Sequence, residues 1–372
     1  MKSTIISRGQ ERAPIRRISV SLYRVTTDFP EADGTISWDV TNLVVVEATA
    51  GDFTGLGYTY ADAATAELIR DKLTKEVEGR NAFDIPGSWL AMVKSIRNLG
   101  RPGIASMAIS AVDIALWDLK ARVLGVPLVD LLGRVRDSVP VYGSGGFTSY
   151  PIAKLQQQLA GWVEQGIPRV KMKIGSDPSA DVARVRAARE AIGPGAELFV
   201  DANGAYSRKQ ALYQADAFTQ FDVTWFEEPV TSDDLEGLRL IRDRAPVRME
   251  IAAGEYGYDS WYFRRMLSAE AVDVLQADAT RCAGITGFLQ ASALCQAHHL
   301  PLSAHTAPSV HMHVGCAAIP LRHLEYFHDH VRIESMFFEG LPKPVNGALR
   351  PDSARPGMGI EFKRADAARF AA

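Results

Sequence analysis

Apolar and polar positions alternate over residues 17–60 with the period of β-strands. RISVSLYRVTT and TNLVVVEATA read as strands, and the glycines of GDFTGLGYTY indicate a turn followed by a loop. From about residue 62 to 131 the period becomes helical. ASMAISAVDIALWDLKARVLG predicts a long amphipathic helix that ends at Gly125, with Pro127 just beyond. The opening third therefore predicts an α+β domain.

From Val139 onward, eight short apolar runs recur with helical stretches between them. They are VPVYGSG, RVKMKIG, ELFVDANG, VTWFEEP, RMEIAAGE, VDVLQAD, LPLSAHT and HLEYF. This alternation is typical of parallel β/α units, and eight units most simply close into a barrel. A doubly wound sheet is the alternative, although no GxGxxG follows the first strand. The Gly- and Pro-rich end, GALRPDSARPGMGIEF, is expected to fold back over the first domain.

Composition narrows the class of protein. The 372 residues are 47% hydrophobic and carry a formal net charge of -3, which suits a globular chain and offers no basic surface for nucleic acid. The sequence has no membrane-length apolar run, and its first sixteen or so residues lack a signal-peptide core. We expect a cytoplasmic protein in which that N-terminal stretch is partly disordered. Cys282, Cys295 and Cys316 fit no metal spacing and are interpreted as buried free thiols.

Ionisable residues stand at or near the ends of the apolar runs. Consecutive members of the set are 20 to 28 residues apart, about one β/α unit: Lys173, Asp201, Glu227, Glu255, Asp278, His305 and Glu325. The carboxyl ends of the strands of a parallel barrel open on one face, where such barrels carry their chemistry. We therefore expect these side chains to converge, because charge inside a barrel is costly unless it is paired or bound to metal.

Asp201, Glu227 and Glu255 follow three successive predicted strands. Three neighbouring carboxylates repel one another unless a cation lies among them, and ligation by oxygen alone favours Mg²⁺. The alternative for each acid is a salt bridge or a helix cap, which is a weaker explanation for three in series. Glu228 is expected to point to the other face of its strand. Asn203 could reach a substrate hydroxyl or a metal-bound water, or it is a plain turn residue.

The histidines fall into two kinds. His305 and Asp278 come from neighbouring predicted strands, and a histidine oriented by a buried carboxylate keeps one tautomer and gains basicity, as general acid–base catalysis requires. His311 and His313 resemble a metal pair, but residues two apart do not face each other on a helix. We expect His311 and His313 to be structural.

Lys171 and Lys173 share one face of the predicted strand VKMKIG. At a separation of about 6 Å, two ammonium groups repel by roughly 3 kcal/mol at an effective dielectric of about 20, worth about two pKa units, and Mg²⁺ acts in the same direction. Lys173 is therefore expected to be partly neutral near neutral pH and to act as a base, while Lys171 binds an anion. With His305, Glu325 and a metal, this set suits removal of the proton beside a carboxylate through an enediolate.

Several motifs resemble those of the mandelate racemase subgroup of the enolase superfamily. They are KMK (171–173), VDANG (200–204), FEEP (226–229), AAGE (252–255), ADATRCAGITG (277–287), SAHTAP (303–308), HLEY (323–326) and the helix SAVDIALWDLKA. The resemblance covers nearly the whole chain. It implies an α/β fold, a modified (β/α)7β TIM barrel over 137–335 under an α+β capping domain over 1–136, and a C-terminal segment, 336–372, that returns to the cap.

The resemblance also implies roles for the strand-end residues: Mg²⁺ ligation by Asp201, Glu227 and Glu255, Lys173 as base on one face of the substrate, His305 with Asp278 as base or acid on the other, and Glu325 on the substrate carboxylate. Cap loops over about Thr26–Ser37 and Thr54–Asp62 are expected to close the site. Phe29, Trp38 and Tyr58 are the candidate residues there for substrate selection.

Related subgroups differ at one position. Muconate-lactonising and dipeptide-epimerase relatives resemble one another in a lysine on the sixth strand, where this chain has Arg281, which cannot give up its proton. This argues against cycloisomerase, succinylbenzoate-synthase and dipeptide-epimerase activities. The resemblance favours dehydration of a sugar acid (an aldonate or aldarate) to a 2-keto-3-deoxy acid. Racemisation or epimerisation of a 2-hydroxy acid is the alternative, a catalytically silent homologue is a remote one, and the family tendency is a dimer or octamer.

Overall fold

The computed structural model describes residues 13–372. Partial disorder is expected for the first sixteen or so residues. Residues 1–12 of that stretch lie outside the described residues. From residue 13 the chain packs on the cap, since Pro14 bridges to Asn81 and Ile15 is buried. Across residues 13–372, none of the helices is both long and apolar enough to span a bilayer.

The cap contains a three-stranded antiparallel sheet. Its strands, in spatial order, are β1 (Arg17–Ala32), β2 (Ser37–Ala50) and β3 (Phe53–Thr59). The loop expected over Thr54–Asp62 is therefore wrong for most of its length. Gly55 and Gly57 serve close packing instead, because a Cβ on them would lie 2.2 and 2.1 Å from the carbonyl oxygens of Ala115 and Ala111 in α4.

The loop expected over Thr26–Ser37 is mostly strand as well. β1 and β2 form one long hairpin, and only its tip, residues 33–36, lies outside the strands. The Asp33 Oδ1 atom holds the tip by accepting two backbone N–H groups at 2.6 and 2.8 Å. A Cβ on Gly34 would lie 2.3 Å from the carbonyl oxygen of Ala202. The hairpin tip therefore touches the carboxyl end of the barrel.

The remaining part of the cap is helical. Its helices are α1 (Ala63–Leu68), a π-helical turn (Ile69–Leu73), α2 (Thr74–Val77), α3 (Ile85–Ser95), α4 (Ile104–Leu124) and α5 (Leu128–Leu132). The predicted end of α4 is confirmed: Gly125 is left-handed, with φ 69°, and closes the last turn.

Eight parallel strands close into the predicted barrel. In order they are β4 (Val139–Gly145), β5 (Arg169–Lys173), β6 (Glu197–Asp201), β7 (Val223–Glu227), β8 (Glu250–Ala253), β9 (Val274–Ala277), β10 (Leu302–Ala304) and β11 (Leu321–Phe327). Each strand pairs with its sequence neighbour, and β11 pairs with β4 to close the ring. The barrel expectation is confirmed.

Helices between the strands cover the outside of the barrel. They are α6 (Ile152–Glu164), α7 (Asp181–Ile192), α8 (Arg208–Phe218), a 3-10 turn (Thr219–Phe221), α9 (Leu235–Arg244), α10 (Ser260–Ser268), α11 (Gly284–Ala297) and α12 (Pro308–Ala317). After β11, helix α13 (His328–Phe337) turns toward the cap, and the Tyr58 hydroxyl donates to Glu334 at 2.6 Å.

The barrel interior is layered. A fully packed layer of Tyr142, Phe199, Trp225, Ala252 and Val274 fills one level, and the Phe199 and Trp225 rings stack with centroids 5.3 Å apart. The indole N–H of Trp225 donates to Glu227 at 2.9 Å. The apolar floor of the barrel therefore meets the charged mouth directly at Trp225.

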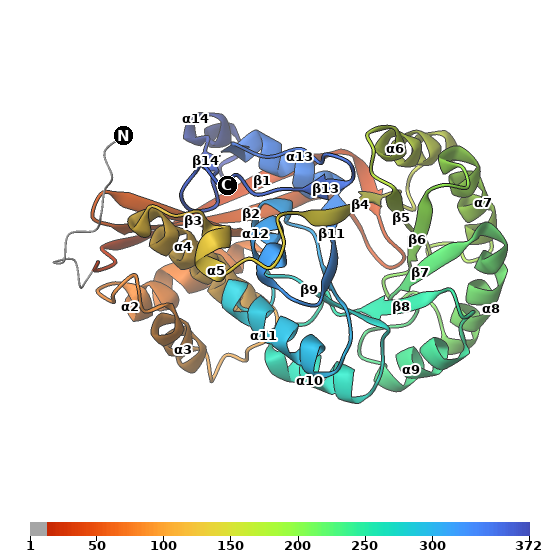
Figure 1. Cartoon of the computed structure of the whole chain (residues 1–372), viewed down its shortest axis with the longest axis horizontal. Coiled ribbons are helices and arrows are strands. Elements are labelled where there is room, and N and C mark those ends of the chain that lie inside the picture. Colours follow the sequence, from red (N-terminus) through yellow and green to blue (C-terminus); the bar gives the residue numbers. More distant parts are fainter. Residues whose placement is uncertain (1–12) are drawn as a thin grey trace.

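The chain ends on the cap, as the Gly- and Pro-rich segment predicted. The last elements are β12 (Phe338–Glu339), β13 (Ala348–Leu349), β14 (Glu361–Phe362), α14 (Arg364–Ala367) and a 3-10 turn (Ala368–Phe370). Figure 1 shows β14 and α14, in blue, beside β1, in red, and the backbone N–H of Ala372 donates to the carbonyl of Leu22 at 3.1 Å.

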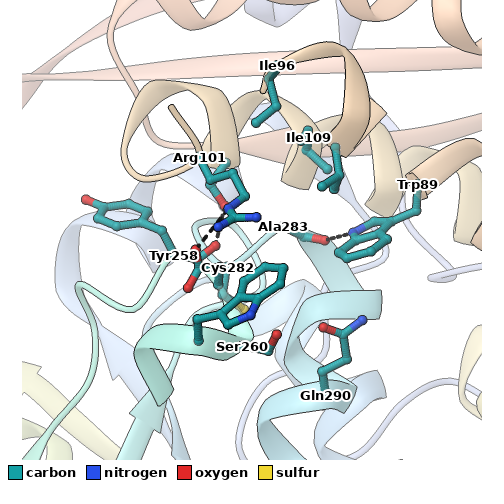
Figure 2. Close-up of a pocket in the computed structure, with 13 residues that line it drawn as sticks. Trp89, Ile96, Arg101, Ile109, Tyr258, Ser260, Cys282, Ala283 and Gln290 are labelled. Carbon is teal, nitrogen blue, oxygen red and sulfur yellow. Dashed lines mark hydrogen bonds and ion pairs between the residues drawn. The ribbon is translucent and has the colours of Figure 1, made fainter. Parts of the chain in front are cut away.

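A separate contact joins the cap helices to the barrel helices (Figure 2). The Trp89 indole donates to the carbonyl oxygen of Ala283 at 2.8 Å, and the Arg101 guanidinium pairs with Asp259 and covers the Trp261 ring. The cavity there holds about 20 Å³, and its lining is mostly apolar. These contacts connect the cap to the starts of α10 and α11 in the barrel domain.

The three cysteines are buried free thiols, as expected.

Candidate active site

Three carboxylates meet where β6, β7 and β8 end. Asp201 and Glu227 are the last residues of their strands and pair in register, and Glu255 follows β8 by two residues. Each offers an oxygen within 4.8 Å of the oxygens of the other two, and all three side chains are buried. The Glu255 Oε2 atom accepts no hydrogen bond. A buried all-oxygen donor set with an oxygen that accepts no hydrogen bond fits a hard cation such as Mg²⁺.

The charges of this cluster are coupled. Burial and the Asp201 carboxylate raise the pKa of Glu227 to about 8, although Lys171 opposes the shift. Burial also raises the pKa of Asp201, but Lys173 and Lys171 lower it more, so the net pKa is below the ordinary value. The ionised forms of these buried acids therefore need positive charge nearby to be stable in the folded protein.

Both lysines point into the barrel, as the alternation of β5 predicts. Lys171 is fully buried and lies 2.9 Å from Glu325 and 3.3 Å from Asp201, and it also contacts Glu227. The Lys173 Nζ atom lies 2.5 Å from Asp201 Oδ2. Each lysine is therefore held by acids.

This pairing corrects the expected state of Lys173. Burial and Lys171 lower its pKa, but the Asp201 carboxylate raises it more, so the protein's own charges place the pKa above the ordinary value. Repulsion between the two lysines does not suffice to make Lys173 neutral, because a carboxylate lies against each ammonium group. A cation that engaged Asp201 would weaken this hold and favour the neutral amine.

His305 is oriented by the neighbouring strand. Its Nδ1 atom lies 2.8 Å from Asp278 Oδ2, and Asp278 Oδ1 accepts the backbone N–H and the hydroxyl of Thr280, both at 2.7 Å. The Nε2 atom faces Glu255 at 3.3 Å and Glu325 at 3.6 Å. Burial lowers the pKa of His305, but these acids raise it more, to about 9.

Glu325 lies on the last barrel strand and completes the ring of charges. The Ser144 hydroxyl donates to its Oε1 atom at 2.5 Å, and its Oε2 atom accepts no hydrogen bond. Sequence reasoning missed Ser144. It lies on β4, and only the closure of β11 onto β4 brings it to Glu325.

One cavity of about 210 Å³ collects the predicted proton carriers. Its lining comes from the barrel and the cap: Lys173, Glu255, Tyr256, Arg281, His305, Thr306, Glu325, Phe327, Asp329, His330, Asp33, Ile36, Trp38 and Thr41. Asp329 and His330 follow Glu325 closely, so the strand-end criterion could have found them. Asp33 and Thr41 carry no such signal, because the hairpin register alone brings them to the barrel.

Only one of the three cap candidates lines this cavity. Trp38 does. Tyr58 does not, because it is fully buried and its hydroxyl is bonded to Glu334 of α13. Phe29 packs against Tyr150, with ring centroids 5.3 Å apart.

A second cavity, of about 480 Å³, shares the Tyr256 wall. Asn203 and Glu228 line it, and Asn203 Oδ1, Glu228 Oε1 and the Tyr262 hydroxyl are buried without hydrogen-bond partners. Glu228 does not continue the alternation of β7, because the strand ends at Glu227 and Glu228 has a positive φ of 40°. The backbone N–H of Asn203 donates to Asp201 at 2.9 Å, so Asn203 is a turn residue that also borders a cavity.

His311 and His313 lie on α12, and each contacts backbone carbonyl oxygens: His311 Nδ1 lies 2.7 Å from that of Thr306, and His313 Nε2 lies 3.1 Å from that of Met358. They form no metal-ligand group in residues 13–372. The structural interpretation of both histidines agrees with these contacts.

Known proteins resemble the chain over most of its length. It is 35% identical over 292 residues to the L-talarate/galactarate dehydratase of Salmonella typhimurium, covering 77% of this chain and 73% of that one. A crystal structure of that enzyme with Mg and L-lyxarohydroxamate superimposes with a TM-score of 0.88 at 28% identity, over 98% and 95% of the two chains. A mandelate racemase/muconate lactonizing enzyme-like protein from Rubrobacter xylanophilus gives a TM-score of 0.95 at 55% identity, over 96% and 100%.

A further relative bears on the reaction class. The 3,6-anhydro-alpha-L-galactonate cycloisomerase of Streptomyces coelicolor is 32% identical over 359 residues, which are 94% of this chain and 98% of that enzyme. Arg281 argued against cycloisomerases, but a relative of nearly full length bears that name. The relatives therefore include the class of enzyme that Arg281 argued against.

Two family models match the two parts of the chain. The model described as "Mandelate racemase / muconate lactonizing enzyme, N-terminal domain" matches residues 18–133, and the model described as "Enolase C-terminal domain-like" matches residues 154–367. The matches agree with the capped barrel. The chain belongs to the mandelate racemase subgroup of the enolase superfamily.

Proposed function

We propose that the protein is a Mg²⁺-dependent dehydratase of a sugar acid. One observation carries the proposal: Lys173, His305, Glu325 and Glu255 line a single cavity, and Glu255 belongs to the cluster of three acids. Named dehydratases among the relatives support the reaction class.

In this proposal Asp201, Glu227 and Glu255 hold the cation. When bound, Mg²⁺ neutralises the charge that develops on the substrate carboxylate. The all-oxygen donor set supports this assignment, as does the buried Glu255 Oε2 atom, which accepts no hydrogen bond and faces His305 Nε2 at 3.3 Å.

The protein's own groups move the protons. Lys173 takes the proton from the carbon beside the carboxylate, and Glu325, in its protonated form, donates a hydrogen bond to the carboxylate. His305, held through Nδ1 by Asp278, gives a proton from Nε2 to the departing β-hydroxyl, which leaves as water. The enol that remains tautomerises to a 2-keto-3-deoxy acid. Lys171 holds Glu325 and the acid cluster in place.

The polar walls suit a polyhydroxylated substrate. Asn203 and Tyr262 present buried atoms without partners at the second cavity, where substrate hydroxyl groups could bond to them. Trp38 provides an apolar surface on the cap side of the first cavity. This lining supports an aldonate or aldarate over a purely apolar 2-hydroxy acid.

The proposal is tested by incubating the enzyme and Mg²⁺ with a library of sugar mono- and diacids and measuring keto-acid formation. We expect one or more substrates to give a keto acid, and Lys173→Ala and His305→Asn to abolish its formation. Lys209→Ala, on the surface, is the matched control and should retain full turnover. Turnover retained by both site variants would overturn the mechanism.

Other products would identify other reactions. Loss of optical activity without keto acid would indicate a racemase or epimerase, which the presence of both Lys173 and His305 on one cavity also allows. Conversion of an anhydro acid or lactone would indicate a cycloisomerase. The absence of hydrogen–deuterium exchange beside the carboxylate of any acid would indicate a silent homologue.

A further inference from the structure

We propose that Asp28, Glu31 and His328 form a second divalent-cation site, separate from the three acids of the barrel mouth. Asp28 and Glu31 come from β1 of the cap hairpin, and His328 begins α13 of the barrel domain. Each residue offers one ligand atom, and these atoms lie within 4.8 Å of one another. The site would join the cap to the barrel.

Glu31 provides the independent observation. Its side chain is fully buried, and its Oε2 atom accepts a hydrogen bond from the Trp38 indole at 2.9 Å. The Oε1 atom is buried with no hydrogen-bond partner. A buried carboxylate oxygen without a partner is costly, so its presence calls for a ligand or a proton. Burial, with Asp329 and Asp28 nearby, raises the pKa of Glu31 to about 9, and a bound cation would replace the proton.

The surrounding charges favour a cation. His328 Nε2 lies 3.2 and 3.1 Å from the two Asp28 oxygens. The Arg332 guanidinium lies 2.6 Å from Asp329, and it also donates to a backbone carbonyl. Arg332 pairs with Asp329, and its charge lowers the pKa of Glu31 less than Asp329 and Asp28 raise it. Asp28 and Glu31 therefore remain as two acids beside one imidazole.

The ligand set selects the kind of metal. One imidazole nitrogen and two carboxylates suit Zn²⁺ and similar transition metals, whereas Mg²⁺ prefers oxygen ligands alone. The side chains of His328 and Asp28 are 25% and 41% exposed, so a metal ion could enter from solvent and water could complete its coordination. We therefore assign the site to a transition-metal dication.

The proposed site is linked to the cavity of the proton carriers through Trp38. Glu31 holds the indole of Trp38, and Trp38 lines the cavity of the proton carriers. Asp329, next to His328, lines the same cavity. A cation bound by both elements would fix the cap hairpin across that cavity.

Zn²⁺ binding to the full-length chain tests the proposal. The Glu227→Gln variant, in excess Mg²⁺, weakens the barrel-mouth site for Zn²⁺, so equilibrium dialysis reports the second site. We expect about one bound equivalent, and His328→Ala in this background should weaken binding on the order of 100-fold. Asp28→Ala, at a partly exposed position, should weaken it too without unfolding the chain. His299→Ala removes an exposed histidine elsewhere and is the matched control, which should bind normally.

Indole fluorescence gives a second measurement. Co²⁺ in place of Zn²⁺ should quench Trp38, so the quenching seen in Glu227→Gln should disappear when Trp38→Phe or His328→Ala is added. The proposal is overturned if Glu227→Gln binds no Zn²⁺, or if His328→Ala and Asp28→Ala bind it as tightly as the background. Neither result depends on whether the protein is a dehydratase.

Discussion

The chain buries two groups of acids in opposite ways. On α4 of the cap, Asp118 accepts the backbone N–H groups of Leu56 and Met358 at 2.8 and 2.6 Å and the guanidinium of Arg122 at 2.7 Å. Each partner belongs to a different part of the cap or to α4 itself. Asp118 therefore ties β3 and the C-terminal segment to one helix.

At the barrel mouth the acids face one another. Asp201 and Glu227 share two lysines, whereas Glu255 pairs with Arg281 and His305. One oxygen of Glu255 and one of Glu325 accept no hydrogen bond. Both groups of acids are almost completely buried, so burial alone does not separate them. The partners do: donors fixed by the backbone mark a structural acid, whereas convergent acids with unpaired oxygens mark a ligand site.

The largest effect is expected from a substitution in the group of acids at the barrel mouth. Glu227→Gln should lower turnover by about 10³-fold or more, because a ligand of the proposed cation is lost. The melting temperature of the chelated protein should not fall, since glutamine can still accept from the Trp225 indole and no longer repels Asp201. Differential scanning calorimetry should show that Mg²⁺ raises the melting temperature of the wild type and not of the variant.

Asp118→Asn is the matched control for that experiment. It lies on α4, away from the cavity, and should retain the Mg²⁺-dependent rise in melting temperature. Wild-type turnover in Glu227→Gln would contradict the assignment of the cluster.

The second largest effect is expected from removing the carboxylate of Asp118 in the cap. Asp118→Ala should reduce the free energy of unfolding by about 3–5 kcal/mol, because it leaves two buried N–H groups and part of the Arg122 charge without a partner. Urea denaturation measures the loss. Asp130→Ala, which removes a half-exposed pair with Arg134, should cost about 1 kcal/mol at most. Similar losses in both variants would show that the Asp118 contacts add little.

The sequence predicted those features that depend on local periodicity. Alternation placed Lys171 and Lys173 on the inner face of β5, and one charge per β/α unit predicted that Asp201, Glu227 and Glu255 converge, because parallel strands end on the same face. The end of α4 followed from its glycine. The same logic could have reached Asp329 and His330.

The features that were missed depend on contacts between distant segments. Ser144 meets Glu325 only through the closure of β4 on β11, and the glycines of β3 look like a loop until α4 lies against them. Tyr58 lies at the expected place in the cap, but it is bonded to α13 instead of facing the cavity. The charge of Lys173 could not be predicted from Lys171 alone, since the nearest group is a carboxylate of another strand.

The smallest effect is expected at Asp113, a second buried acid of the cap that can be compared with Asp118. Asp113, also on α4, accepts the backbone N–H and the hydroxyl of Thr286 at 3.0 and 2.7 Å. Burial raises its pKa from 3.8 to about 7, although these hydrogen bonds oppose the shift. The folded state therefore binds this proton more tightly than the unfolded state. The stabilisation that follows is fully present below pH 3.8 and is lost as the pH rises through about 7.

Asp113→Asn removes this titration. Between the two pKa values, the free energy of unfolding of the variant should fall less steeply with rising pH than that of the wild type, by up to about 1.4 kcal/mol per pH unit. Urea denaturation at a series of pH values measures both slopes. Equal slopes would mean that Asp113 is ionised throughout, with the Thr286 donors offsetting its burial entirely. Asp113 and Asp118 would then be alike in charge as well as in their fixed donors, and the cap would hold both as carboxylates without any cation.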